Sequence, residues 1–220
     1  MTGAREAGDA GRFFGVYPAI VTDIVDPDRL GRVEVRFPWL GSAGDQVRAW
    51  ATLLTPYADD DQGFVAFPAV DTQVVVAFEA GDVRRPYIVG SCWNGKEMVP
   101  VTPTKPNDKR VIKSRSETLL EFDDGPSGPK LTIKTKQGHL LVLDEGTQKI
   151  ELTHMNGPTV TLNAAGQVEI KANATVEITA SALNVHAATA VFDGIISCTT
   201  LNASNGVVSP SYTPGAGNVW

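Results

Sequence analysis

The C-terminal half of the chain carries a short β repeat that limits the folds open to the protein. Three segments share the pattern apolar–polar–apolar at a step of eight residues, namely Val160–Leu162, Val168–Ile170 and Val176–Ile178. Looser copies precede them at Leu131–Ile133 and Ile150–Leu152. A repeat of this length predicts an elongated β architecture in which each unit packs only on its neighbours.

Each repeat offers too few apolar side chains to fold alone. Two or three of them per step bury too little area to offset the loss of backbone entropy, and the strand edges stay unpaired. Association meets both needs, because several chains can share one apolar axis. We therefore expect a homotrimer with an intertwined β-helix; two-fold and four-fold arrangements satisfy the same pattern. The expected trimer core is Val160, Leu162, Val168, Ile170, Val176 and Ile178.

The N-terminal part has a different pattern, with five strand-like segments. They span residues 15–26, 32–37, 47–54, 72–80 and 85–93. Within the second, Val33, Val35 and Phe37 alternate with charged residues, which predicts a strand with one buried face. No segment shows a helical period. Five short strands of this kind favour a small closed barrel such as an OB-fold.

The expected fold class is therefore all-β, with an N-terminal OB-fold barrel followed by a C-terminal intertwined trimeric β-helix needle. The expected segments are a tail at 1–12, the barrel at 13–93, a proline-rich linker at 94–114, the β-helix at 115–208 and a tip at 209–220.

Charge and composition exclude several classes of function. The net charge of −6 argues against a nucleic-acid partner, which usually requires a basic surface. The two cysteines, Cys92 and Cys198, have no zinc or redox spacing. No apolar run has the length of a signal peptide or a membrane span. We expect synthesis in the cytoplasm.

The sequence offers little for catalysis or for a cofactor. Asp59, Asp60 and Asp61 are consecutive, so they point in different directions and read as a solvated loop and not as a cation site. A G-x-S-x-G nucleophile motif is absent. We expect no enzyme and no cofactor.

His154 is the strongest metal candidate, although we expect no metal. It shares strand parity with Ile150 and Leu152, so three copies would place three imidazoles around an axis.

Three stretches of the chain carry a family pattern. They are PAIVTDIVDPDRLGRVEVRFPWLG at 18–41, RAWATLL through NGKEMVP at 48–100, and KSRSETLLEFDD at 113–124. In these stretches the chain resembles the spike proteins of contractile injection machines. That group includes the central spike of contractile phage tails, the VgrG proteins of type VI secretion and the spikes of phage-tail-like particles. The repeat half is similar to their trimeric β-helix in period more than in identities. Some spikes of this family hold a metal near the tip through an H-x-H pattern. This chain lacks that pattern.

The resemblance implies a structural trimer at the end of the inner tube of the machine. It implies a separate hub protein, a PAAR-type tip protein, effector cargo and transient contact with the target membrane. Trp39, beside Pro38, is the candidate hub contact; covering its own barrel is the other interpretation. Tyr212 and Trp220 are the candidate tip docking residues, and Trp220 is alternatively a hydrophobic plug.

Other functions remain as alternatives. One is a nucleic-acid-binding OB protein with an oligomerising β tail, which a DNA-binding assay would reveal. Another is a receptor-binding tail fibre, which would bind a receptor at its tip. A third is a cell-wall hydrolase on a needle, against which the short linker argues.

Overall fold

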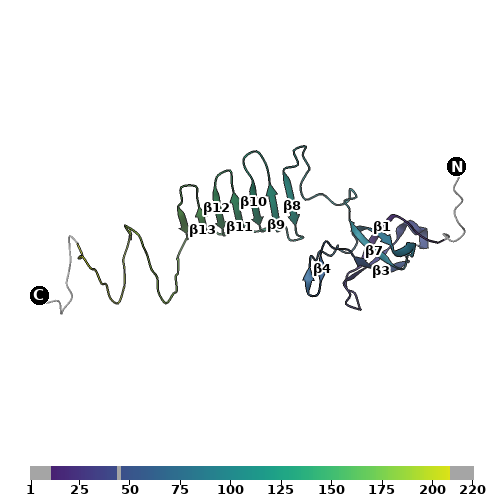
Figure 1. The fold of residues 1–220 in the computed structure, drawn as a ribbon, viewed down its shortest axis with the longest axis horizontal. Helices are drawn as coiled ribbons and strands as arrows, with labels where there is room; N and C mark the ends of the chain where they lie inside the picture. The colour runs from purple at the N-terminus through teal and green to yellow at the C-terminus, as the bar shows by residue number, and fades with distance from the viewer. Residues whose placement is uncertain (1–10, 44–45, 209–220) are drawn as a thin grey trace. The chain divides into compact units, whose positions relative to one another are not determined.

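The structure is a computed structural model, and it describes residues 11–43 and 46–208. As predicted, the chain is all-β: it forms a closed barrel and, later in the sequence, an antiparallel sheet (Figure 1). The described residues divide into two compact units, with the boundary between Asn173 and Ala174.

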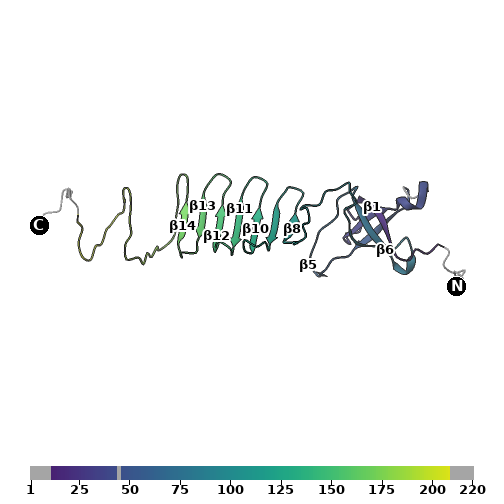
Figure 2. The same ribbon diagram turned by 90° about the horizontal axis from the view of Figure 1, so that it is seen from above.

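Five strands close the barrel in the order β1-β2-β3-β7-β6. Figure 2 shows the barrel from a second direction, with β1 and β6 labelled. These are β1 (Val16–Asp23), β2 (Arg32–Arg36), β3 (Arg48–Leu53), β6 (Gln73–Phe78) and β7 (Pro86–Ser91). All their pairings are antiparallel except β3 with β7, which is parallel. All five strands lie within the ranges that the sequence predicted.

The alternation of β2 explains the barrel core. Val33, Val35 and Phe37 are fully buried, while Arg32, Glu34 and Arg36 lie on the other face and are partly exposed. The remaining core residues are Ala19, Val21, Ala51, Val74, Val76, Phe78 and Ile88. Pro38 ends the strand, since proline has no N–H to donate to a ladder, and opens the 3₁₀ segment η1 (Pro38–Ala43).

Two further elements connect the barrel strands. The segment expected as a solvated acidic loop forms a small hairpin of β4 (Ala58–Asp59) and β5 (Gln62–Gly63), with Asp61 in the left-handed region at φ 52°. The 3₁₀ turn η2 (Glu79–Gly81) joins β6 to β7.

Seven strands form the antiparallel sheet in sequence order. They are β8 (Lys109–Lys113), β9 (Leu119–Asp123), β10 (Lys130–Lys134), β11 (Leu140–Asp144), β12 (Lys149–Thr153), β13 (Thr159–Leu162) and β14 (Val168–Lys171). The sheet begins at Lys109, inside the range expected as linker, because Arg110 and Ile112 continue the pairing with β9.

Residues 174–208 form no strand in the single chain, and their side chains are exposed. Val176 and Ile178, two of the six expected core residues, lie here at 55% and 66% exposure.

Candidate assembly interface

One face of the seven-stranded sheet is covered by apolar side chains in two rows. Residues two apart on a strand point to the same face, so the register of the strands places both rows together. The first row is Phe122, Leu131, Leu143, Ile150, Leu162 and Val168, with Arg110 at its β8 end. The second row is Ile112, Leu120, Ile133, Leu141, Leu152, Val160 and Ile170.

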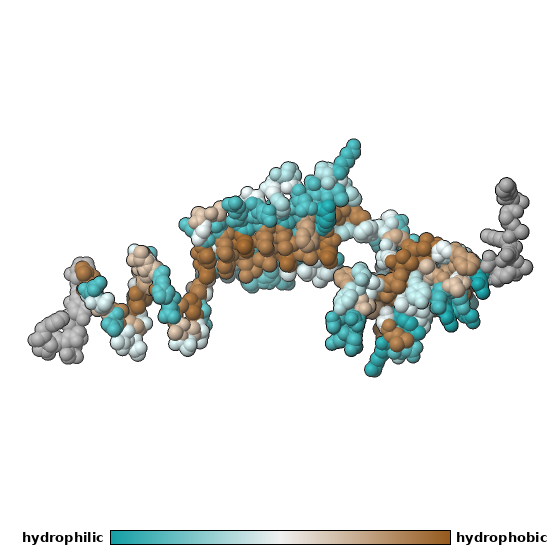
Figure 3. All heavy atoms as spheres, in the orientation of Figure 1, coloured by the Kyte–Doolittle hydropathy of each residue, from teal (hydrophilic) through white to brown (hydrophobic). Residues whose placement is uncertain are grey.

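This apolar face, defined by the two rows, is open to solvent in the single chain. Val168 is 65% exposed, Ile112 61% and Ile170 59%. Figure 3 shows an unbroken hydrophobic band along the sheet. Isolated apolar residues are ordinary on a protein surface, but a contiguous patch of this extent marks an interaction site.

The opposite face of the sheet carries a row of charged side chains, together with Val111, Leu119, Leu140 and Val142. One row across it reads Lys109, Asp123, Lys130, Asp144 and Lys149, so charges alternate from strand to strand. Lys109 Nζ lies 3.3 Å from Asp123 Oδ2, and Lys130 Nζ lies 3.1 Å from Asp144 Oδ2. The pKa of Asp123 is lowered by the backbone N–H of Gly125 and by Lys109, and the pKa of Asp144 by the backbone N–H of Thr147 and by Lys130.

Four of the expected trimer-core residues lie on the apolar face. Val160 pairs with Ile170 and Leu162 pairs with Val168 across β13 and β14. The repeat pattern missed the contributions of β8, β9 and β11. The signal in β11 was an unbroken apolar run, Leu140–Leu143, which marks a strand without showing which side chains share a face.

Trp39 lies in an aromatic cluster of its own barrel. Its ring stacks on Tyr17 at a centroid distance of 4.6 Å and meets Phe13 edge-on at 4.9 Å. Phe37 and Phe78 complete the cluster. The indole Nε1 of Trp39 is buried and has no hydrogen-bond partner among the described residues. Contact with its own barrel, one of the two sequence interpretations, is therefore present in the single chain.

The turn between β1 and β2 is held by one buried carboxylate. Asp26 accepts hydrogen bonds from the backbone N–H groups of Asp28, Leu30 and Arg32. The Arg32 guanidinium adds two more and also reaches Asp28 at 2.6 Å. These donors hold the pKa of Asp26 well below its usual range, with Arg32 the largest cause.

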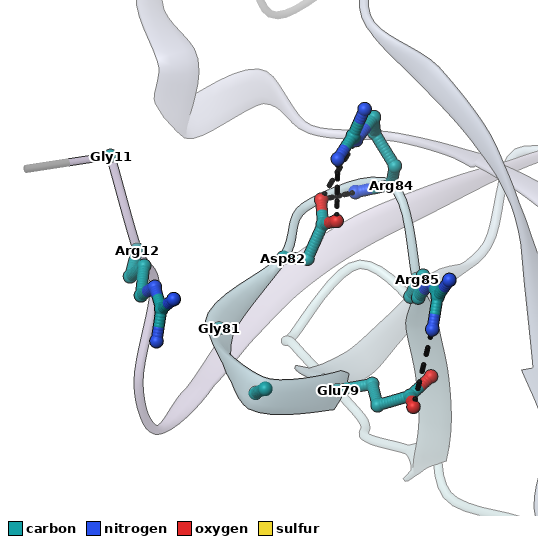
Figure 4. Close-up of a pocket in the computed structure, with 8 residues that line it drawn as sticks. Gly11, Arg12, Glu79, Gly81, Asp82, Arg84 and Arg85 are labelled. Atoms are coloured by element: carbon teal, nitrogen blue, oxygen red, sulfur yellow. Dashed lines mark hydrogen bonds and ion pairs between the residues drawn. The ribbon is translucent and has the colours of Figure 1, made fainter. Parts of the chain in front are cut away.

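A shallow pocket lies between Arg12 and the turn from β6 to β7 (Figure 4). Its acidic residues are already matched by arginines. Arg84 donates to Asp82 at 2.8 Å, and Arg85 lies 3.4 Å from Glu79. The hydrogen bonds from Arg84 lower the pKa of Asp82 to about 2. The pocket therefore presents acidic side chains that are paired with arginines.

The comparison with known families identifies the barrel. Residues 17–93 match the model of the type VI secretion system/phage-baseplate injector OB domain. Similar curated proteins include two spike proteins of Pseudomonas aeruginosa. The type VI secretion system spike protein VgrG5 is 28% identical over 165 residues, 68% of this chain. The spike protein VgrG4b is 27% identical over 169 residues, 70% of this chain.

The chain is similar to VgrG spike proteins, and its barrel matches the injector OB domain. A third relative, the spike protein VgrG3 of Vibrio cholerae, is 25% identical over 117 residues, half of this chain. The chain matches only about a fifth of the length of VgrG5 and of VgrG4b, and 12% of VgrG3. The family resemblance expected from the sequence is thus confirmed.

The other residues that the sequence analysis singled out are His154, Tyr212 and Trp220. Tyr212 and Trp220 lie outside the described residues. His154 lies beside His139, with ring centroids 4.5 Å apart. No group of three or more His, Cys, Asp or Glu side chains that could hold a metal occurs within residues 11–43 and 46–208. In the same part of the chain, no helix is long and apolar enough to cross a membrane.

Proposed function

We propose that three copies of this chain form the spike of a contractile injection machine. In this spike, the apolar faces of three sheets pack around a common axis. The observation that carries the proposal is the continuous exposed apolar face on a chain that also bears an injector OB domain.

Burial of this face supplies the driving force for association. Complete burial of a Val, Leu, Ile or Phe side chain contributes about 1.5–3 kcal/mol. Several residues of the face are about half exposed in the single chain, so each has roughly 1 kcal/mol still to gain. The row of ion pairs on the opposite face stays in water and loses no hydration.

Residues 174–208 gain strand partners only in the assembled spike. Their apolar positions, including Val176 and Ile178, continue the repeat of β13 and β14 but have no strand partner among residues 11–43 and 46–208. Pairing between chains would satisfy both their backbone groups and their apolar side chains. A rod with every strand paired resists bending when the inner tube drives it forward.

The partners follow from the position of such a spike. The OB-fold barrel attaches to a separate hub at the tube end, with Trp39 and its aromatic cluster as the candidate contact. Tyr212 and Trp220 form a platform for a PAAR-type tip protein, and effector cargo travels with the assembly. The spike acts mechanically: it punctures the target envelope in transient contact with the membrane. A phage tail, a secretion system and an extracellular particle all use such a device.

Sedimentation of the purified chain tests the proposal. A trimer should have three times the chain mass of 23.4 kDa. A monomer that stays soluble at high concentration would contradict it, because the apolar face would then need no partner.

A further inference from the structure

The apolar face ends at two rims of different chemistry, one at each end of its strands. At one rim, turn hydrogen bonds extend the register by one residue: Asp124 N–H donates to Asp108 O, and Glu145 N–H donates to Pro129 O. Strand alternation places these residues on the apolar side. Gln148 lies opposite Glu145 in the turn, where its N–H donates to Glu145 O. We call Asp108, Asp124 and Glu145, together with Gln148, the acidic rim.

At the other rim, the same extension brings two histidines together. Leu140 pairs with Thr153, so His139 lies opposite His154. Both histidines have the strand parity of Leu141 and Leu152 on the apolar face. We call His139 and His154 the histidine rim.

The two rims have complementary unused groups. Asn156 N–H donates to His154 Nδ1 at 3.2 Å, so the neutral ring carries its proton on Nε2 and offers it as a donor. Glu145 is exposed, and the described residues give its carboxylate no ion pair. Asp124 is matched by Arg110 at 2.6 Å, and Glu117, in the turn before β9, by Lys136 at 3.1 Å.

The rims of one chain cannot meet each other. His154 and Gln148 lie six residues apart along β12, which is about 20 Å of extended strand. Glu145, opposite Gln148 in the tight turn, is equally distant from His154.

A ring of three copies brings opposite rims together. In a cyclic assembly, one end of each subunit surface meets the other end of the next. If the strands stack along the axis, the corner between two sheets joins an acidic rim to a histidine rim. Cyclic symmetry keeps equivalent residues of the three copies at the same position along the axis. Glu145, His139 and His154 all belong to the β11–β12 pair, so they lie at nearly the same level of the stack.

We propose that His139 and His154 of one copy contact Glu145 of the next copy at each corner of the spike. This inference rests on the proposed function and adds the identity of the corner contact. The contact favours the parallel, unstaggered arrangement of the three sheets, which the uniform apolar rows do not specify.

Cross-linking tests the contact directly in the full chain. With Cys92 and Cys198 replaced by serine, His154→Cys and Glu145→Cys are combined and treated with a short bis-maleimide. We expect covalent dimers and trimers on denaturing gels, and only monomers from either cysteine alone. The matched control combines His154→Cys with Asp108→Cys, an acidic-rim position four strands away, about 19 Å along the stack.

Two outcomes overturn different statements. A trimer by sedimentation that yields no more cross-link from the Glu145 pair than from the Asp108 pair overturns the corner contact and leaves the proposed function intact. A monomer by sedimentation overturns the proposed function itself. As a second measurement, Glu145→Lys should lower the melting temperature of the trimer, and adding His154→Glu should restore it. An absence of restoration counts against the contact.

Discussion

Asp26 and Arg32 are joined by a two-pronged ion pair that closes the turn between β1 and β2. Arg32 Nε donates to Asp26 Oδ2 at 2.9 Å, and a terminal guanidinium nitrogen donates to Oδ1 at 2.8 Å. The Asp26 side chain is only 3% exposed, so the same carboxylate also serves as the acceptor for three backbone N–H groups. A change at this one position therefore removes partners from several buried donors.

We predict that Asp26→Asn destabilises the barrel. An amide has one acceptor oxygen and cannot match both the guanidinium and the backbone donors, and unpaired buried donors are costly. The expected result is a fall of several degrees in the melting temperature. Asp28→Asn is the matched control. The side chain of Asp28 is 67% exposed and accepts a hydrogen bond from Arg32, so its change should cost less stability. Equal effects at both positions would contradict the role assigned to Asp26.

Acid should destabilise the barrel in a defined window. The pKa values of Asp26 and Asp82 are lower in the folded chain than the ordinary value of 3.8, and that of Asp82 is about 2. A lowered folded pKa gives stability that is fully present above the unfolded pKa and lost as the pH falls toward the folded pKa. Melting temperatures should therefore fall between about pH 4 and pH 2, and Asp82→Asn should flatten part of that fall. A flat profile in the wild type would be inconsistent with these pairs.

Substitutions on the two faces of β14 should differ in their effect on the stability of the trimer. Ile170→Asp places a carboxylate on the apolar face of each copy, and like charges brought together out of water are strongly unfavourable. We expect loss of the trimer at micromolar concentration with the barrel still folded. Glu169→Ala, on the charged face beside Lys171, should leave the trimer intact. Sedimentation and the melting temperature are the measurements. Equal effects of Ile170→Asp and Glu169→Ala on the trimer would contradict the assignment of the two faces.

Hydrogen exchange should report the ordering of residues 174–208. In the trimer these residues gain strand partners, so their amides should exchange slowly. In the Ile170→Asp chain they should exchange at the rate of an unfolded segment, while β11 keeps its protection. Fast exchange across 174–208 in a verified trimer would mean that these residues do not pair between chains.

Deletion of residues 210–220 tests the tip. Tyr212 and Trp220 are large aromatic residues, the type most often found as interface anchors. We expect the truncated chain to remain a trimer but to lose binding of a PAAR-type protein in a pull-down. Undiminished binding would remove the docking role and leave Trp220 as a plug.

Alternation made the barrel predictable from sequence. Val33, Val35 and Phe37 alternate with charges because one face of β2 meets the core and the other meets water. The same logic located Leu131–Ile133, Ile150–Leu152, Val160–Leu162 and Val168–Ile170, each of which lies in a strand of the sheet.

Other parts of the structure depend on information that the pattern lacks. In β11, Leu140–Leu143 is apolar throughout, so periodicity could not assign its faces. The hairpin of β4 and β5 has two residues per strand, too few for any period. The histidine rim, in which His139 lies opposite His154, depends on the register between β11 and β12. Val176 repeats the pattern of Val168 yet forms no strand. The pattern shows that a segment is suited to strand pairing, but it does not show whether a neighbouring strand is present.

The open face of the sheet also affects the free chain before assembly. β14 is an edge strand whose backbone is unpaired on one side, and Val168 and Ile170 on it are exposed. Such an edge is a template for indiscriminate pairing with other chains. The unassembled copy is therefore expected to be the aggregation-prone form of the protein. In the proposed trimer, soluble yield should depend on how quickly each new chain meets its partner copies compared with how quickly it aggregates.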